Sequence, residues 1–494
     1  MSKYPETRAA IFFKGVTSKP KLVISISLLL IFFAASFLPK LYKDTTADAF
    51  ISKDNPALIY KDKVKDIFGL ADPMVMAIVH KDGVFTPETL KLIYDLNSKI
   101  EKLSNVDPDR ITSLATENNI YGNEEGMIVE GFFNPNPPKT EAEADAIKDS
   151  ISNFPLYQGS LVARDNTVTL IVAELLDETK SEQTYANFMK IAEQANLTNG
   201  EEIHVAGEGA ITGYLGAYID NDAKKLNPLA GLVITIILFI AYRTLFGMLL
   251  PNIIVGATVA SAVGVMAANG IAFFVVTNAL IVILIGIAVA DSIHIFSQYY
   301  EEKSKNIGAE QRVIVVRAMN EIWRPITLTT MTTVAGFLGL YFASEMPPFR
   351  YLGLFSALGV IVAWFYSLTF LPAALSLLKI KPSKAFKVDA LGALKNDYFS
   401  HIMSALGKKV ITYPKIVLAF GFTFIMLGIF GAVNLQVNED RIDTFNKSEP
   451  IYKADKIINA AMDGTNNLDI VIETPNPEDL FEPKNLRKIE AFQT

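Results

Sequence analysis

The 494-residue sequence contains no cysteine, only four histidines and two tryptophans, and only 20% charged residues. Without cysteine the chain has no disulfide, thiolate metal site or iron–sulfur cluster. The histidines at 80, 204, 294 and 401 are scattered without the spacing of metal ligands, so we expect no metal and no other cofactor. A soluble protein carries about 25% charged residues, whereas half of this chain is hydrophobic and gathered in long blocks. The composition therefore argues against a soluble enzyme.

Motifs of several other protein classes are also missing. The sequence has no Gly-x-x-x-x-Gly-Lys-Ser/Thr, which excludes ATP hydrolysis by a P-loop, and no Gly-x-Ser-x-Gly. The net charge of −7 gives no reason to expect a nucleic-acid partner. The chain is also too apolar to be disordered. What remains is a membrane protein that is not an enzyme.

The hydrophobic blocks have the length of membrane-spanning helices. A bilayer core about 30 Å thick needs about 20 apolar residues in a helix. Seven blocks qualify or nearly qualify: 22–38, 228–241, 246–268, 272–296, 326–342, 352–378 and 416–433. The first is too long for a signal-peptide core and no Ala-x-Ala site follows it, which favours an uncleaved anchor. We predict a polytopic α-helical membrane protein with seven transmembrane helices.

The distribution of charge predicts the orientation of these helices. Lys and Arg concentrate in the N-terminal flank, in the 299–324 loop and in the 379–415 linker. If the helices alternate, these three segments lie on one side, which the positive-inside rule makes cytoplasmic. The segment 41–226, in which acidic residues outnumber Lys and Arg, then lies outside.

This topology divides the chain into seven parts. They are a cytoplasmic N-terminus at 1–21, transmembrane helix 1 at 22–39, an extracytoplasmic α+β domain at 40–226, transmembrane helices 2–6 at 227–380, a cytoplasmic linker at 381–411, transmembrane helix 7 at 412–434 and the start of a second outside domain at 435–494. Between helices 4 and 5, an apolar stripe of Val313, Val316 and Met319 predicts an amphipathic helix at about 301–322 on the inner surface.

The outside segment has the pattern of a porter-like α+β domain. We expect strands at 74–79 and 203–206, helices at 87–103 and 185–197, a hairpin at 156–174 and a loop at 118–139. Strands interleaved with helices in this way fit a split βαβ sandwich.

The chain also repeats itself. Pro20-Lys21 matches Pro414-Lys415, and similar pairs of short matches follow in the same order, each about 395 residues apart. The matched stretches include 48–50 with 443–445, 55–56 with 449–450, 74–79 with 468–472 and 85–87 with 481–483. We expect one complete unit followed by the start of a second, as in transporters built from parallel repeats. The alternative is a seven-helix protein with a short outer tail.

The fourth hydrophobic block carries two ionisable residues, Asp291 and His294. Charged groups in hydrocarbon cost several kcal/mol, so they are functional candidates by default. The i, i+3 spacing places both on one helix face, and a carboxylate beside an imidazole can bind a proton near neutral pH. Gly286 would let another helix approach closely. The alternative is that both residues sit at the cytoplasmic helix end and meet lipid headgroups.

The fifth block opens with Pro325, which suits a first helical turn. Thr329 and Thr333 follow on one face at i, i+4. Their hydroxyls either pass protons or hydrogen-bond Asp291, or they only hold helices together. The sequence does not decide between these roles.

Two motifs carry a resemblance to a known family. The run from Gly286 to His294 resembles the fourth-helix motif of the resistance–nodulation–division (RND) superfamily, and the run from Arg324 to Gly336 resembles its fifth-helix opening. The resemblance is to the MmpL-like and hopanoid-exporter-like branch, whose helices 2–6 are related to sterol-sensing domains. In that pattern the usual aspartate position is Ala290 here, and Asp291 stands one residue later.

The resemblance implies proton-driven export of hydrophobic or lipid-like molecules from the bacterial inner membrane, with a cytoplasmic N-terminus. Its implied partners are protons, membrane lipid and the substrate, and whether the chain forms a homo-oligomer is left open. The implied proton relay is Asp291, His294, Thr329 and Thr333, and the implied helix-packing positions are Gly286, Pro325 and Gly336. Two alternatives stay open: a sterol-sensing-type lipid receptor or scaffold, and a proton-driven accessory of protein secretion.

Overall fold

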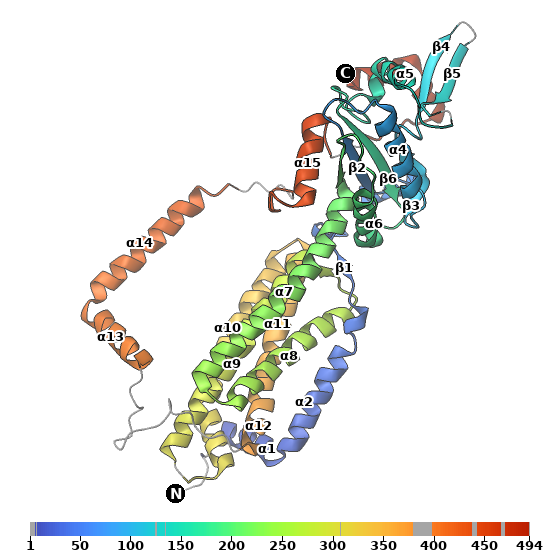
Figure 1. Cartoon of the computed structure of the whole chain (residues 1–494). Helices are drawn as coiled ribbons and strands as arrows, with labels where there is room; N and C mark the ends of the chain where they lie inside the picture. Colours follow the sequence, from blue (N-terminus) through green and yellow to red (C-terminus); the bar gives the residue numbers. More distant parts are fainter. Residues whose placement is uncertain are drawn as a thin grey trace. The chain divides into compact units, whose positions relative to one another are not determined.

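The computed structural model describes Pro5 and residues 7–123, 126–133, 135–306, 308–378, 398–436, 442–465 and 470–493 (Figure 1). The chain divides into two compact units. The membrane unit comprises Met1–Ser52 and Leu215–Glu439, and the α+β unit comprises Lys53–Tyr214 and Asp440–Thr494.

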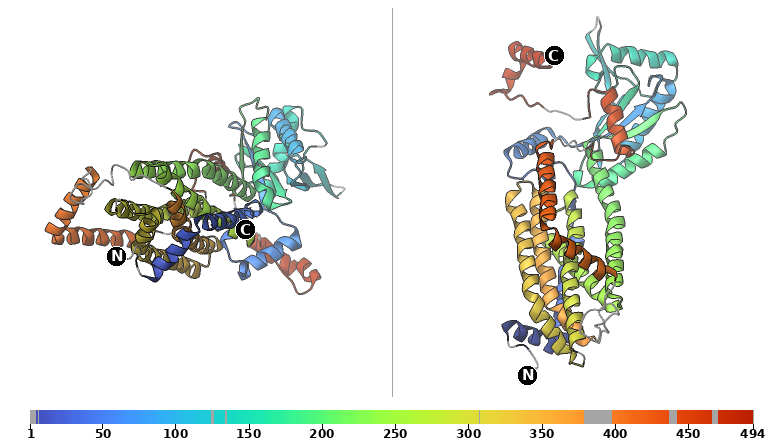
Figure 2. Two further views of the ribbon diagram at one scale, coloured as in Figure 1. Left: turned by 90° about the horizontal axis from the view of Figure 1, so that it is seen from below. Right: turned by 90° about the vertical axis from the view of Figure 1, so that its left-hand side faces the viewer.

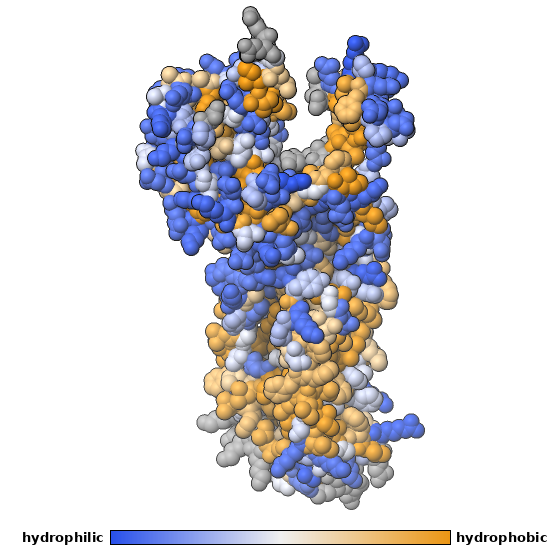
Figure 3. Space-filling model, turned by 90° about the vertical axis from the view of Figure 1, so that its right-hand side faces the viewer, coloured by the Kyte–Doolittle hydropathy of each residue, from blue (hydrophilic) through white to orange (hydrophobic). Residues whose placement is uncertain are grey.

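Seven helices in the described part of the chain are long and apolar enough to cross a membrane. They are α2 (Pro20–Ala35), α7 (Glu208–Tyr242), α8 (Leu245–Ala268), α9 (Asn278–Lys305), α10 (Gln311–Ala343), α11 (Pro347–Leu368) and α14 (Pro414–Val433). The space-filling view shows a broad hydrophobic surface over these helices (Figure 3). This confirms the prediction of a polytopic α-helical membrane protein.

Several helices extend well beyond their hydrophobic blocks. α7 has 35 residues and contains Pro228, although its apolar block was the shortest. The separate amphipathic helix predicted at 301–322 is wrong, because α9 runs to Lys305 and α10 already begins at Gln311. Its apolar stripe, which includes Val316 and Met319, is buried in the bundle rather than laid on a membrane surface.

The sixth hydrophobic block forms two helices instead of one. α11 ends at Leu368, and α12 (Phe370–Leu377) follows after a break at Thr369. The Thr369 hydroxyl donates to the Phe365 carbonyl at 2.6 Å and satisfies one of the last carbonyls of α11. Most of the predicted cytoplasmic linker, up to residue 397, lies outside the described residues, and α13 (Tyr398–Thr412) occupies its end.

The N-terminal segment holds a helix that the hydrophobic pattern did not reveal. α1 (Arg8–Ser18) lies crosswise at one end of the bundle, against α10 and α12 (Figure 2). The Thr7 hydroxyl caps it by accepting from the Ala10 amide at 3.1 Å, and Ala10, Phe13 and Val16 are buried. The turn at Lys19 then leads into α2, which begins at Pro20.

At the other end of the bundle, a short clasp joins two connections. β1 (Lys43–Asp44) pairs in parallel with β8 (Phe273–Phe274), just before η5 (Val275–Thr277) and α9. Lys43 also forms an ion pair with Asp220 of α7 at 3.0 Å. The chain after α2, through η1 (Leu38–Lys40) and η2 (Asp48–Phe50), is thus fastened to the turn between α8 and α9.

The α+β unit is built on a four-stranded antiparallel sheet in the order β3-β6-β2-β7. Its strands are β2 (Pro73–Val79), β3 (Val106–Thr112), β6 (Val168–Leu175) and β7 (Glu202–Ala206). The helices α4 (Pro87–Ile100) and α6 (Ser181–Glu193) connect them in the pattern of a split βαβ fold. The predicted fold class of this region is therefore confirmed.

The helix α4 shows why the sequence pattern was informative here. The Thr86 hydroxyl accepts from the Thr89 amide at 3.2 Å, and Pro87 stands in the first turn, where its missing N–H costs nothing. Leu90, Ile93 and Leu96 are fully buried, as their helical spacing predicted.

Two loop and hairpin predictions are wrong. The segment 118–139 contains a hairpin of β4 (Asn118–Asn123) and β5 (Gly126–Gly131), which pair side chains such as Ile120 and Val129. The predicted hairpin at 156–174 keeps only β6 as a strand. Its first arm forms η3 (Pro155–Tyr157) and meets only the start of β6, where Val162 bridges Thr169. There the Ala163 amide donates to the Val168 carbonyl, and the Leu170 amide donates to the Leu161 carbonyl. The helix α5 (Glu141–Ser152) and the turn η4 (Glu178–Lys180) complete the unit.

The segment after α14 packs on this same sheet. α15 (Pro450–Ala461) buries Ile451, Ala454 and Ile458, and forms an apolar cluster with residues of the sheet. It is followed by η7 (Pro477–Phe481) and α16 (Pro483–Gln493). Residues 470–472, which belong to the stretch matched with 74–79 in the repeat, do not form a strand, and residues 468 and 469 lie outside the described part.

The partly buried His204 of β7 makes the stability of the α+β unit sensitive to acid. His204 lies 3.5 Å from Glu202, yet burial lowers its pKa below the ordinary 6.5, and Lys453 opposes its protonation. The folded state therefore favours the neutral ring, so its stabilising effect is present above pH 6.5 and is lost as the pH falls below it. We expect His204→Gln to reduce the drop in melting temperature across this range. An unchanged drop in the variant would show that other groups cause it.

Candidate functional site

The strongest candidate site is the middle of α9. Asp291 follows Asn278, the first residue of α9, by 13 positions and precedes Glu301, the next charged residue, by ten. At about 1.5 Å per residue, Glu301 is about 15 Å away along the helix, half the thickness of a bilayer core. The position in the middle of a helix that is apolar enough to span a membrane favours the site over the alternative of a headgroup contact, and the depth of Asp291 in the membrane stays a prediction.

The surroundings of Asp291 are apolar. Asp291 is only 8% exposed, and it lies next to Ala288 and Ile295, which are fully buried in the bundle core. Among the described residues, no hydrogen bond or ion pair reaches its carboxylate. The neighbouring Ser292 is buried too, but its hydroxyl donates to the Ala288 carbonyl of the same helix at 3.3 Å. A carboxyl group in such a place is far cheaper to keep neutral than charged.

The structure does not pair Asp291 with His294. The helix turns Asp291 into the bundle, whereas His294 is exposed on its surface. The spacing i, i+3 separates two side chains by about 60° around a helix, enough to divide them between a buried and an exposed side. Within the described bundle the two side chains are therefore covered differently, and their shared role in a proton relay stays a prediction.

The threonines of α10 do not reach Asp291 either. The Thr329 hydroxyl donates to the Ile326 carbonyl at 2.9 Å, and the Thr333 hydroxyl donates to the Thr329 carbonyl at 2.8 Å. Both bond their own helix. Pro325 lies inside α10 and not in its first turn, contrary to the prediction. Thr327 instead joins two helices, since it accepts from the Trp364 indole of α11 at 3.0 Å.

The two glycines predicted to allow close packing have free space around them. A Cβ atom placed on Gly286 or Gly336 meets nothing within 4 Å in the described part of the chain. Close packing occurs at Gly353 instead, where a Cβ would lie 2.6 Å from the Phe337 carbonyl oxygen, and at Gly359 against Leu284. Small residues in a membrane helix mark contacts, but the sequence alone does not tell which contact is made.

Polar groups that the sequence reasoning missed surround the C-terminal half of α9. The Tyr242 hydroxyl donates to the Ile293 carbonyl at 2.9 Å, and Tyr300 bonds Thr244 at 3.1 Å. Gln311 donates to the Tyr299 hydroxyl at 2.7 Å and to the Leu375 carbonyl at 2.8 Å. These bonds fix α9 to α7, α10 and α12. The neighbouring Tyr299 and Tyr300, which follow the fourth hydrophobic block, were the only feature of the sequence that pointed to these bonds.

Three buried hydroxyls of the membrane unit lack partners in the described part of the chain. They are the oxygens of Thr258 on α8 and of Ser356 and Ser367 on α11. Buried hydroxyls in native proteins are bonded to protein or to water, so these oxygens are places where water can enter the bundle.

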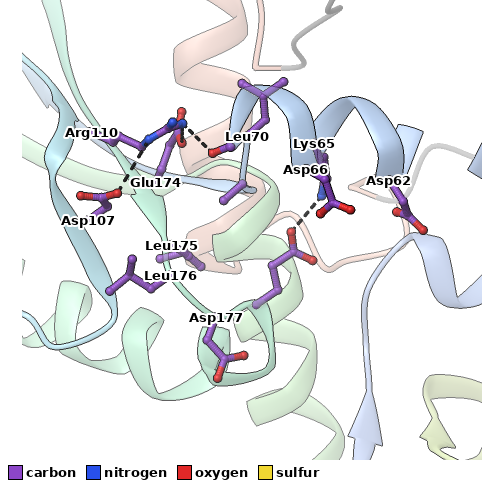
Figure 4. Close-up of a pocket in the computed structure, with 13 residues that line it drawn as sticks. Asp62, Lys65, Asp66, Leu70, Asp107, Arg110, Glu174, Leu175, Leu176 and Asp177 are labelled. Carbon is purple, nitrogen blue, oxygen red and sulfur yellow. Dashed lines mark hydrogen bonds and ion pairs between the residues drawn. The ribbon is translucent and has the colours of Figure 1, made fainter. Parts of the chain in front are cut away.

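The α+β unit has a polar pocket of about 720 Å³ (Figure 4). Lys65 contacts Asp72 and Glu178, each at 2.8 Å, and Arg110 contacts Glu174 at 2.9 Å. Burial alone would lower the pKa of Lys65, but its two carboxylate partners raise it above the ordinary 10.5. Both basic side chains of the pocket are paired with carboxylates, and these ion pairs hold separate parts of the chain together.

Comparison with known proteins decides the family. The sequence profile described as MMPL family matches residues 135–388, just over half of the chain. The chain belongs to the MMPL family. This confirms the resemblance to the MmpL-like branch of the RND superfamily that the motifs at Gly286–His294 and Arg324–Gly336 suggested, and it makes the chain a multi-pass membrane protein.

Three relatives show how far the similarity extends. The putative membrane protein MJ1562 of Methanocaldococcus jannaschii is 24% identical over 368 residues, which cover 72% of this chain and 90% of that protein. The probable transport protein MmpL8 of Mycobacterium bovis is 25% identical over 47% of this chain, and the hopanoid transporter HpnN of Rhodopseudomonas palustris is 23% identical over 54%. These two matches span only 22% and 28% of the transport proteins.

Proposed function

We propose that this MMPL-family chain takes part in proton-driven export of hydrophobic or lipid-like substrates across the bacterial inner membrane, with Asp291 as the group that binds the proton. Membership of the family and the printed names of MmpL8 and HpnN, a transport protein and a hopanoid transporter, support the transport of lipid-like molecules. The proton step rests on the structure of α9.

The observation that carries the proposal is the buried, unbonded carboxyl of Asp291 in the described bundle. A permanently charged carboxylate there would cost several kcal/mol. A side chain that always stayed neutral would not need to be ionisable. A group that exchanges its proton as the helices move satisfies both conditions. Changing its charge then biases α9 between two arrangements.

The exposed surface of α9 and α10 supports a further helix contact. His294, Gly286, Gly336 and Thr329 are all exposed, although they lie along the membrane-spanning part of these helices. An ionisable ring facing lipid is costly, and small residues favour contact between helices. We propose that another helix of the duplicated protein covers this face, and that His294, Thr329 and Thr333 complete the proton path there.

The membrane potential supplies enough energy for this step. Moving one charge through it releases about 2.3 kcal/mol per 100 mV, comparable with the gap between two protein conformations. With the basic flanks inside, the N-terminus is cytoplasmic and protons enter from the side of the α+β unit.

Proton uptake in liposomes tests the proposal. The purified protein is reconstituted, a pH gradient is imposed, and the internal pH is followed with a trapped dye in the presence and absence of lipid extract. We expect proton flux that rises with an exportable lipid. Lipid binding without any proton flux would contradict the proposal and favour a sterol-sensing-type receptor.

A further inference from the structure

Asp291 and its neighbour Ala290, the usual aspartate position of the resembled motif, face different sides of α9. Consecutive residues of a helix point about 100° apart. Ala290 is exposed on the surface of the described bundle, whereas Asp291 is turned into it and is 8% exposed. The carboxyl group of this chain therefore has its neighbours among the helices of its own bundle.

The helix α11 packs on the side of α9 that carries Asp291. A Cβ atom on Gly359 of α11 would clash with the side chain of Leu284 of α9, so the two helices touch at these residues. Both helices run in the same direction, because α10 returns between them (Figure 1). Asp291 follows Leu284 by seven residues, and Tyr366 follows Gly359 by seven. Seven residues make two turns, which bring each side chain back to nearly the same face about 10 Å further along. Asp291 and Tyr366 thus stand at matching positions of two packed helices.

Tyr366 is buried and brings a hydroxyl group to this level of the bundle. It is 3% exposed and belongs to the same core cluster as Ala288 and Ile295, which lie next to Asp291. Its hydroxyl interacts with the Ser261 hydroxyl of α8. The helices α8, α9 and α11 each contact the other two. Ser261, Asp291 and Tyr366 therefore come from three helices that pack on one another.

Two further hydroxyls beside this group are buried. Thr258 precedes Ser261 by about one turn of α8, and Ser367 follows Tyr366 on α11. Both residues are fully buried, and neither hydroxyl oxygen has a hydrogen-bond partner in the described part of the chain. Buried hydroxyls normally bond protein or water. This level of the bundle can therefore support polar contacts beyond those of one arrangement of the helices.

We propose that Tyr366 is the hydrogen-bond donor that holds Asp291 when its carboxyl group is charged, and that Ser261 positions Tyr366 for this bond. A tyrosine hydroxyl can accept from a serine and donate to a carboxylate at the same time. A hydrogen bond to a charged group is roughly twice as strong as one between neutral groups. The bond therefore forms when the proton leaves Asp291 and weakens when it returns, so that α11 responds to the charge on α9. The proposal deepens the proposed function, since it rests on Asp291 as the group that binds the proton.

Infrared spectroscopy tests the contact without requiring transport. The full-length protein, with isotope-labelled aspartate, is reconstituted in liposomes at alkaline pH, and the carboxylate band of Asp291 is assigned as the one that Asp291→Asn removes. We expect this band to shift in Tyr366→Phe, which removes one hydroxyl but keeps the ring. Tyr351→Phe on the same helix is the matched control and should not move the band, because the ring of Tyr351 stacks on Phe274 and the substitution keeps that contact. An unchanged band in Tyr366→Phe, or no carboxylate band that Asp291→Asn removes, would overturn the proposal.

Proton flux in the same liposomes measures what the contact does. We expect Tyr366→Phe to slow the flux about tenfold, Ser261→Ala to slow it by a smaller factor, and Tyr351→Phe to leave it unchanged. Normal flux in Tyr366→Phe would remove Tyr366 from the proton step and leave Asp291 as the proton site. A parent protein without proton flux would contradict the proposed function instead, and the infrared band would still decide whether Tyr366 bonds Asp291.

Discussion

Asp291→Asn is expected to abolish proton-coupled transport while leaving the protein folded. The amide has nearly the shape of the carboxyl group but cannot take up or release a proton. Loss of a proton-transferring side chain typically slows the step it serves by about a hundredfold or more. Substrate export in liposomes under a pH gradient, together with the thermal melting temperature in detergent, measures both effects.

The change in melting temperature shows whether Asp291→Asn loses transport because the proton site is gone or because the protein no longer folds. An uncharged amide costs less to bury in this apolar core than a carboxylate, so the melting temperature should stay the same or rise. Ser292→Ala is the matched control, because Ser292 is equally buried on the next position but bonds only its own helix. It should transport normally. Undiminished export by Asp291→Asn would show that the proton binds elsewhere.

Gly353→Val is expected to destabilise the membrane unit strongly. A Cβ on Gly353 would lie 2.6 Å from the Phe337 carbonyl oxygen and 2.8 Å from the Tyr341 nitrogen. Both are backbone atoms of α10, so α10 and α11 must move apart, and overpacking of this kind costs about 1–3 kcal/mol or more. The melting temperature of the detergent-solubilised protein, followed by size-exclusion chromatography, should fall accordingly.

Gly256→Val on α8 is the control for this substitution. Gly256 is exposed, and a Cβ there meets no atom within 4 Å in the described residues. The same gain of an isopropyl group should therefore leave the melting temperature close to that of the parent. Equal losses for both variants would mean that valine harms these helices in general and that the contact at Gly353 is not special.

The sequence was most informative where one physical rule acts along the chain. The length of the apolar blocks revealed the membrane helices, and the spacing of Leu90, Ile93 and Leu96 revealed α4. Such rules failed where tertiary contacts override the local preference of the sequence. Pro325 usually marks a helix start, but α10 continues through it because its preceding turns are already packed in the bundle. The hairpin of β4 and β5 was hidden among glycines and asparagines.

The candidate site was only partly visible in the sequence. The cost of a charge in lipid singled out Asp291, and its burial in the middle of α9 agrees with that reasoning. The expected partners, His294 and Thr329, were not found with it, because periodicity does not fix which side of a helix faces the core. The bonds of Tyr242 and Gln311 to α9 and α12 depend on tertiary geometry and had no sequence motif.

The clasp between β1 and β8 limits how α9 can move. The strand Phe273–Phe274 leads through η5 directly into α9, and its partner Lys43–Asp44 lies on the connection that leaves α2. Sliding α9 along its axis by about two residues, or about 3 Å, corresponds to one strand residue and would take this short ladder out of register. A movement of α9 along its axis must then either separate β1 from β8 or displace the connection that follows α2. The clasp therefore couples an axial movement of α9 to the chain that leaves α2.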